Sequence, residues 1–185
     1  MKKKKNIYLI FSYNGTIFST VLQKFSRTKY IHVSIGIDDN LKEVYSFGRK
    51  FPEWMFPSGF TVEDFDLVTK IFKNSICQIY KLEISNSDYK KLVSELKKYI
   101  DKKNKYKYNI KGLIHIQFNK IYHRDNHFVC SQFVGKLLQD SGIYDFKKDY
   151  SVVKPKDITT IDGLEKIYEG KIINYIRMLS YEEKN

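Results

Sequence analysis

Alternating apolar and polar positions predict the strands of the chain. The apolar run over residues 6–12 predicts a first strand, and alternating β-branched residues over 30–37 predict a second. A polar turn at 38–40 precedes another alternating run over 43–47, so residues 30–48 are expected to form an antiparallel hairpin. Further strands are expected near 59–63, over 76–84 and near 171–176.

Apolar residues spaced three and four positions apart predict helices. A first helix is expected from a cap at Asn14 or Thr16 to about residue 27, and a second begins at a cap formed by Ser85 or Ser87. The first has an apolar stripe of Ile17, Phe18, Val21, Leu22 and Phe25. The stripe of the second is Tyr89, Leu92, Val93, Leu96 and Ile100.

The remaining segments lack a clear period. Residues 49–70 mix aromatics, prolines and acids, which predicts a long loop that includes the short strand near 59–63. The stretch 97–111 holds seven Lys and one acid and predicts a solvated helix end followed by a basic connector. Because no repeat or linker interrupts the pattern, residues 1–185 are expected to form one domain, with a basic tail at 1–5 and a polar tail at 177–185.

Composition narrows the class of protein. The chain has 185 residues and a formal net charge of +12, which favours contact with anionic surfaces. Its two cysteines, Cys77 and Cys130, are too few for a disulfide framework and are expected to be reduced. The sequence shows neither a signal-peptide pattern nor an apolar run of membrane-spanning length. A cytoplasmic location is therefore expected, with contact to a membrane surface left open.

Cys130 is the strongest candidate for chemistry. A third helix is expected to begin near Asn126 and to stop at Gly142, which places Cys130 in or near its first turn. The helix dipole and free amide hydrogens of a first turn favour a thiolate, and His32 on a predicted strand is a candidate base. Cys130 is also in register with the apolar stripe, so core packing of both residues is an alternative. That stripe consists of Phe133, Val134, Leu137 and Leu138.

Two segments resemble a known family. His32–Ile37 and Phe128–Val134 look like the histidine strand and the cysteine helix of the circularly permuted NlpC-type papain-like proteins. These form the YiiX/YaeF-like group of cysteine amidases and peptidases, related to lecithin retinol acyltransferase. In that group the histidine precedes the cysteine, as it does here. Weaker likenesses at Tyr45–Arg49, Tyr108–Leu113 and Pro155–Asp157 extend the resemblance over about residues 6–176.

The resemblance implies a fold and a reaction. It implies an α+β permuted papain-like (NlpC-type) fold, with an antiparallel sheet packed against the cysteine-bearing helix. It also implies a thiol-dependent hydrolase or acyltransferase, in which Cys130 forms a thioester and His32 is the base. The third residue, which orients the imidazole, aligns with Ser46. A one-residue change in the turn would bring Glu43 or Tyr45 to that position instead.

The substrate-binding residues are expected to be Tyr45, Tyr108 and Trp54, the last within an aromatic loop that could wall the site. The substrate would be a small molecule, peptide or lipid with an amide or ester bond. No cofactor is expected, because the glycines form no phosphate-binding pattern. His115, His123 and His127 with Asp125 are residue types that bind metals, but the cysteine pairing typical of zinc is missing, so no metal is expected.

A binding module is the alternative to an enzyme. Its basic residues, with Tyr106 and Tyr108 between lysines, could hold an anionic partner such as a nucleic acid, a lipid head group or a cell-wall polymer. Nucleic acid is disfavoured because the sequence contains no motif for binding it. In this alternative the chain would be a weakly active or inactive member of the family.

Overall fold

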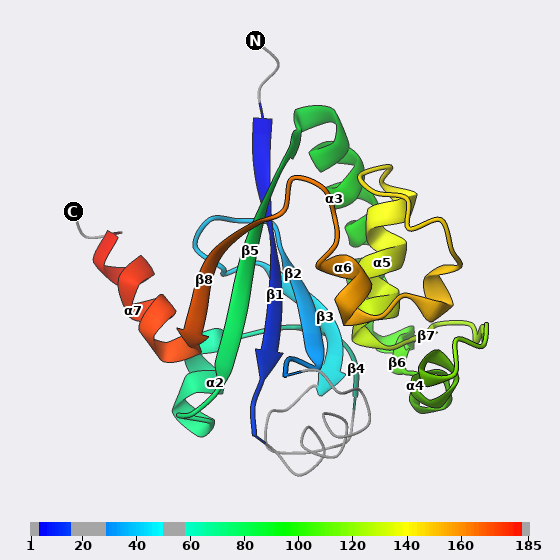
Figure 1. Ribbon diagram of the computed structural model, residues 1–185, viewed down its shortest axis with the longest axis horizontal. Coiled ribbons are helices and arrows are strands. Elements are labelled where there is room, and N and C mark those ends of the chain that lie inside the picture. The colour runs from blue at the N-terminus through cyan, green and yellow to red at the C-terminus, as the bar shows by residue number, and fades with distance from the viewer. Residues whose placement is uncertain (1–3, 16–28, 50–57, 183–185) are drawn as a thin grey trace.

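The computed structural model describes residues 4–15, 29–49 and 58–182, and within them the chain folds as an α+β protein around a six-stranded antiparallel sheet (Figure 1). Every neighbouring pair of strands in this sheet is antiparallel. In spatial order the strands are β4 (Ser58–Val62), β3 (Val44–Arg49), β2 (His32–Gly36), β1 (Lys4–Tyr13), β5 (Ile76–Ser85) and β8 (Glu165–Lys171).

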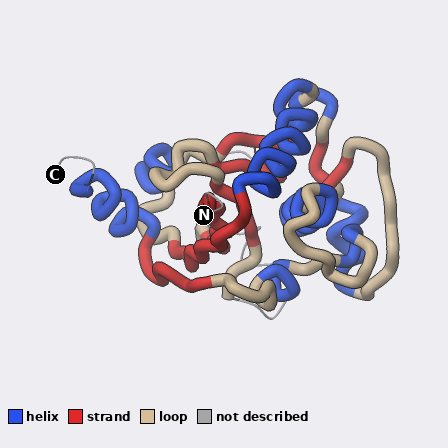
Figure 2. Tube along the Cα trace, turned by 90° about the horizontal axis from the view of Figure 1, so that it is seen from above, coloured by secondary structure: helices blue, strands red, loops and turns tan. Residues whose placement is uncertain are grey.

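Helices cover both faces of the sheet. Figures 1 and 2 place α3 and α5 on one side and α2 and α7 on the other. The α-helices of the described residues are α2 (Phe65–Ile71), α3 (Asn86–Asp101), α4 (Ile110–Gln117), α5 (Cys130–Asp140), α6 (Pro155–Ile158) and α7 (Ile172–Glu182). A small parallel pair, β6 (Lys107–Tyr108) and β7 (His127–Phe128), and the 3₁₀ turns η1 (Lys103–Lys105) and η2 (Tyr150–Val152) complete these elements.

The central strand β1 shows why the sheet is buried on both sides. Successive side chains of a strand point to opposite faces. Ile7 and Phe11 therefore join the core under α3 and α5, whereas Tyr8 and Ile10 join the core under α2 and α7. This explains the continuous apolar run in the sequence.

Most of the predicted elements are confirmed. The strands near 6–12, 30–37, 43–47, 59–63 and 76–84 are present, and β2 and β3 pair antiparallel as the hairpin required. Helix α3 begins at its predicted cap, where Ser85 Oγ accepts a hydrogen bond from the Asp88 amide at 3.1 Å. Its stripe differs in one position, because Tyr99 is buried and Ile100 is 38% exposed.

Two predictions near the ends of strands are wrong. The segment near 171–176 is not a strand: β8 ends at Lys171 and α7 follows, burying Ile172 and Tyr175 at helical spacing. This helix also occupies residues 177–182 of the predicted polar tail. Within the predicted loop 49–70, α2 forms because Asp64 caps it, its carboxylate accepting from the Leu67 amide at 2.9 Å.

Two further helix boundaries differ from the sequence prediction. The third helix, α5, begins at Cys130 rather than near Asn126, which has a positive φ of 58° and precedes the short strand β7. Gly142 ends this region in the left-handed conformation, as expected. The basic stretch 97–111 runs into α4, which begins at Ile110 and is capped by Asn109, whose side chain accepts from the Gly112 amide at 2.9 Å.

The helix expected between Thr16 and residue 27 lies outside the described residues, as does the aromatic loop with Trp54. Among the residues that the structure describes, none of the helices combines the length and apolar character needed to cross a membrane.

Candidate active site

Cys130 is the first residue of α5, and its position is fixed by hydrogen bonds around that turn. The Gln132 side chain accepts from the Val129 amide at 3.0 Å and donates to the Ser151 carbonyl at 2.8 Å. Ser131 Oγ donates to the Val153 carbonyl at 2.7 Å. Because these polar groups are buried and paired, the start of α5 is held rigidly against η2. Cys130 itself is 5% exposed.

His32 and Glu63 meet across three neighbouring strands. His32 is the first residue of β2, and Glu63 directly follows β4, which lies on the far side of β3. The His32 Nε2 atom lies 2.5 Å from Glu63 Oε1, and both side chains are largely buried. Because Nε2 is engaged by the carboxylate, Nδ1 is the ring nitrogen left for Cys130.

The charges of these three groups stabilise one another. Burial opposes a charge on His32, but the Glu63 carboxylate and the Cys130 thiolate outweigh it and raise the pKa of His32 to about 10. Burial likewise opposes ionisation of Glu63, yet His32 holds the pKa of this carboxyl below its ordinary value. These mutual pKa shifts favour an imidazolium between two anions.

The pKa of Cys130 is lowered despite burial. Burial alone would raise it, but the interaction with His32 and the backbone amides of Val33 and Ser131 lower it below the ordinary thiol value. Cys77 is the contrast within the same chain. It lies on β5, on the face covered by α2 and α7, and burial raises its pKa to about 12. Only Cys130 of the two has the environment of a nucleophile.

Ser46, assigned by alignment to the third position, lies beside the acid. It is fully buried on β3, and its hydroxyl interacts with the Glu63 carboxylate without forming a hydrogen bond of ordinary geometry among the described residues. Ser46 and Ser34 contribute to the lowered pKa of Glu63, so both hydroxyls influence the carboxylate. The observed partner of His32 is therefore Glu63, with Ser46 next to that acid.

Glu63 was absent from the candidates drawn from the sequence. The alternation of its strand was the available signal. Phe60 enters the core under α3 and α5, so Glu63, three residues later, is expected on the other face of the sheet. An acid at such a position, at the end of a buried strand, is a candidate partner for a buried histidine.

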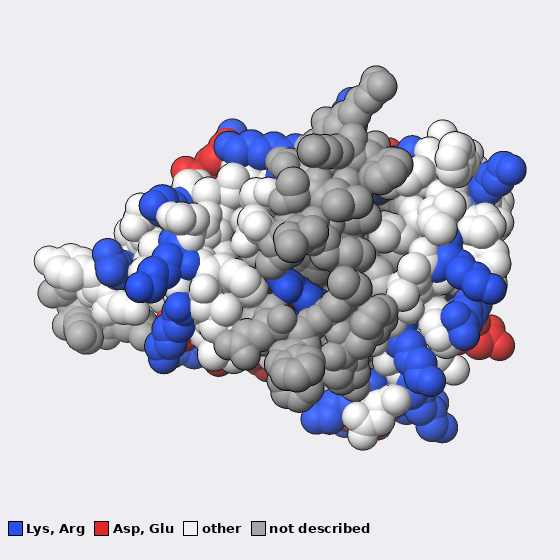
Figure 3. Space-filling view, turned by 90° about the horizontal axis from the view of Figure 1, so that it is seen from below, with Lys and Arg blue, Asp and Glu red and all other residues white. Residues whose placement is uncertain are grey.

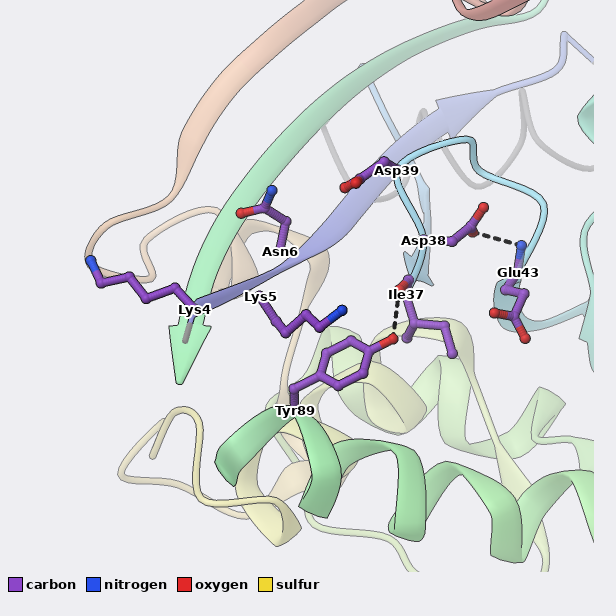
Figure 4. A pocket seen from close by; sticks show the side chains of 8 residues that line it. All are labelled: Lys4, Lys5, Asn6, Ile37, Asp38, Asp39, Glu43 and Tyr89. Carbon is purple, nitrogen blue, oxygen red and sulfur yellow. Dashed lines mark hydrogen bonds between the residues drawn. The ribbon is translucent and has the colours of Figure 1, made fainter. Parts of the chain in front are cut away.

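The two alternates for the third role lie elsewhere. Tyr45 pairs with Ile35, stacks on Phe60 and directs its hydroxyl to Glu43 at 3.4 Å. Glu43 lines a polar pocket of about 410 Å³ at the end of the sheet opposite His32 (Figure 4). The other residues that line it are Lys4, Lys5, Asn6, Ile37, Asp38, Asp39 and Tyr89. Neither alternate shares the surroundings of His32.

Tyr108, expected to bind substrate, lies near the thiol. Its strand β6 pairs with β7, which leads directly into α5, and Tyr108 is the register partner of Phe128. Burial and the charge of the Cys130 thiolate raise the pKa of Tyr108 well above that of a free phenol. Its hydroxyl therefore stays protonated and able to donate a hydrogen bond. Trp54 lies outside the described residues.

The remaining histidines have separate partners. His115 stacks on Tyr122 with ring centroids 4.3 Å apart, and His123 Nε2 lies 3.0 Å from an Asp149 oxygen. His127 Nδ1 interacts with the Asp125 carbonyl at 2.7 Å. Within the described ranges, no group of three or more His, Cys, Asp or Glu side chains is arranged to hold a metal ion.

Comparisons with protein-family models, curated proteins and solved structures find no match to this chain.

The buried ion pair predicts a pH dependence of stability. The pKa of His32 is raised from 6.5 to about 10, so its stabilising contribution is complete below about pH 6.5 and is lost as pH rises through 10. The contribution of Glu63, whose pKa is lowered, is lost when pH falls below its ordinary range. We expect Glu63→Gln to have a smaller decline in Tm between pH 6.5 and 10 than wild type, measured by calorimetry.

Glu43→Gln is the matched control, because its carboxylate lies in the pocket at the other end of the sheet. Parallel Tm profiles for wild type and Glu63→Gln would show that the pair does not hold the imidazolium.

Proposed function

We propose that this chain is a thiol-dependent hydrolase or acyltransferase of permuted papain-like type, acting on an amide or ester bond. The observation that carries the proposal is the buried contact of His32 Nε2 with Glu63 at 2.5 Å, together with the mutual pKa shifts of His32 and Cys130. A thiolate at a helix start, an imidazolium and an orienting acid are the parts that acyl transfer requires. The order of the histidine strand before the cysteine helix supports the permuted arrangement.

The first half of the reaction forms a thioester. The Cys130 thiolate attacks the carbonyl carbon, and the electron pair of the carbonyl π bond moves to its oxygen. As that oxyanion collapses, the bond to the amine or alcohol breaks and the leaving group takes the proton of His32. The backbone amides of Ser131 and Val33, which already act on the Cys130 sulfur, and the protonated Tyr108 hydroxyl are candidate donors to the oxyanion.

The second half regenerates the enzyme. Neutral His32 takes a proton from water, or from an acceptor alcohol or amine, as that nucleophile attacks the thioester carbonyl. The carbon–sulfur bond then breaks, and Cys130 leaves as the thiolate beside an imidazolium. Throughout both halves, Glu63 holds the Nε2 side of the ring, so Nδ1 keeps facing the reacting atoms.

Alkylation of the thiols as a function of pH tests the proposal. We expect iodoacetamide to modify Cys130 with an apparent pKa below the ~8.5 of a free cysteine. His32→Ala is expected to raise that pKa and to slow alkylation at pH 6 by about 10-fold or more, since a smaller fraction of Cys130 is then thiolate. Peptide mass spectrometry separates Cys130 from Cys77, which is expected to stay unmodified over the same range.

His123→Ala is the matched control, because it removes a paired but exposed histidine. A Cys130 that titrates like free cysteine in wild type and is indifferent to His32→Ala would overturn the enzyme proposal. That result would favour the basic binding module instead.

A further inference from the structure

The helix α4 exposes an apolar stripe. Ile110, Ile114 and Phe118 follow one another at intervals of four, which places them along one side of the helix and its C-cap. They are 47%, 59% and 71% exposed, and Ile121, just beyond the helix, is 63% exposed. These four residues are called here the α4 apolar surface. Isolated exposed hydrophobic residues are common on proteins, but a cluster of this kind indicates an interaction site.

The α4 apolar surface lies on an ordered element. The opposite side of α4 buries Gly112 and Ile116, and Asn109 caps its start. After Asn119, which has a positive φ of 52°, the chain turns back so that Tyr122 stacks on His115 of α4. Both ends of α4 are therefore fixed, the start by its cap and the end by this stacking, so the apolar surface lies on an ordered helix.

The charge around this surface has one sign. Residues 102–124 contain seven Lys or Arg and no Asp or Glu. None of these seven cations has an ion-pair partner among the residues that the structure describes, and all seven are exposed. They are Lys102, Lys103, Lys105, Lys107, Lys111, Lys120 and Arg124. On the side of the molecule where α4 lies, Figure 3 shows Lys and Arg atoms separated by uncharged surface, with a small acidic area at the edge.

We propose that the α4 apolar surface docks on a phospholipid bilayer that carries anionic head groups. Branched aliphatic side chains and a phenyl ring gain free energy by entering the acyl boundary, while lysines around them pair with head-group phosphates and carboxylates. Nucleic acid would use the lysines, but three of the four exposed apolar side chains are isoleucines, which offer its bases no aromatic stacking surface. Figure 1 places α4 at a corner of the molecule, away from the sheet, where a flat membrane can reach it.

This docking surface is distinct from the candidate active site, although the chain connects them. Tyr108, whose pKa is raised by the charge of Cys130, is followed by Asn109 and then by α4. Because the α4 apolar surface shares no residue with the candidate active site, docking does not require the thiol. Cys130→Ala is therefore expected to bind vesicles as wild type does. A substrate or product that partitions into the membrane would be brought close to the site by such docking.

Vesicle co-sedimentation of the full chain tests the proposal. We expect binding to phosphatidylcholine vesicles that contain phosphatidylserine, weaker binding to phosphatidylcholine alone, and a loss of binding at high salt. The Ile114→Ser/Phe118→Ser double variant is expected to weaken the association at least ~10-fold, because it removes apolar groups from the acyl boundary. Both residues are mainly exposed, so circular dichroism and Tm are expected to stay as in wild type.

Met178→Ser is the matched control, since Met178 is 51% exposed on α7 at the other side of the sheet. Two results would overturn the proposal: absence of binding to anionic vesicles at low salt, and binding that Ile114→Ser/Phe118→Ser leaves unchanged. Retention of a single-stranded oligonucleotide in preference to vesicles, lost in Lys107→Gln/Lys111→Gln, would assign the surface to nucleic acid instead.

Discussion

Replacing Cys130 with alanine is expected to abolish acyl transfer, with a fall in kcat/KM of about 10⁴-fold or more for any ester or amide that wild type turns over. The thioester cannot form without the sulfur, and the adjacent hydroxyl of Ser131 is committed to the Val153 carbonyl. Turnover of a panel of p-nitrophenyl esters, with mass spectrometry of the acylated protein, measures both the rate and the intermediate.

Cys77→Ala is the matched control for this prediction. It removes the other thiol, which burial keeps protonated, and it lies on the opposite face of the sheet. Its turnover and its acyl adduct on Cys130 are expected to equal those of wild type. Turnover that survives in Cys130→Ala would show that the hydrolysis does not pass through this thiol.

Phe47→Ala is expected to cause the largest loss of stability, about 3–5 kcal/mol in the free energy of unfolding. Phe47 is fully buried on β3, and its ring lies at the centre of an aromatic cluster that joins the sheet to α3 and α5. The surrounding rings, with centroids 5.1–6.3 Å away, are Phe60, Tyr99, Tyr106, Phe128 and Phe133. Removal of the ring leaves a cavity that these stiff neighbours fill poorly.

Urea denaturation measures this change, and Phe118→Ala is its control. Phe118 is the same residue type but is 71% exposed, so its replacement is expected to alter the free energy of unfolding by less than ~0.5 kcal/mol. Equal effects of the two substitutions would show that the cluster around Phe47 does not organise the core.

The sequence predicts strands well here because local alternation and burial agree. Sequence-based prediction fails where a segment suits a helix and a strand about equally and tertiary packing decides between them. The β-branched residues Ile172, Ile173 and Ile176 favour a strand locally, but a helix buries Ile172 and Tyr175 against the sheet. Helix α4 was missed because its first two residues belong to the lysine-rich stretch 97–111 and Gly112 weakens the helical pattern, although Asn109 supplies an ordinary cap.

In the candidate site, too, some residues can be identified from the sequence and others cannot. Cys130 and His32 are each recognisable from a local pattern and from their order along the chain. Glu63 is not, because its relation to His32 depends on β4 lying two strands away from β2 and on a diagonal reach across β3. Alignment by position on the neighbouring strand selects Ser46, which lies next to the acid rather than in its place.

The three groups of the candidate site come from β2, the end of β4 and the start of α5, which meet only in the finished tertiary structure. In an unfolded or misfolded chain, Cys130 is therefore expected to react as slowly as an ordinary cysteine. If the three groups act as proposed, fast alkylation of Cys130 requires all three elements to be packed, so its alkylation rate is expected to report native assembly during refolding.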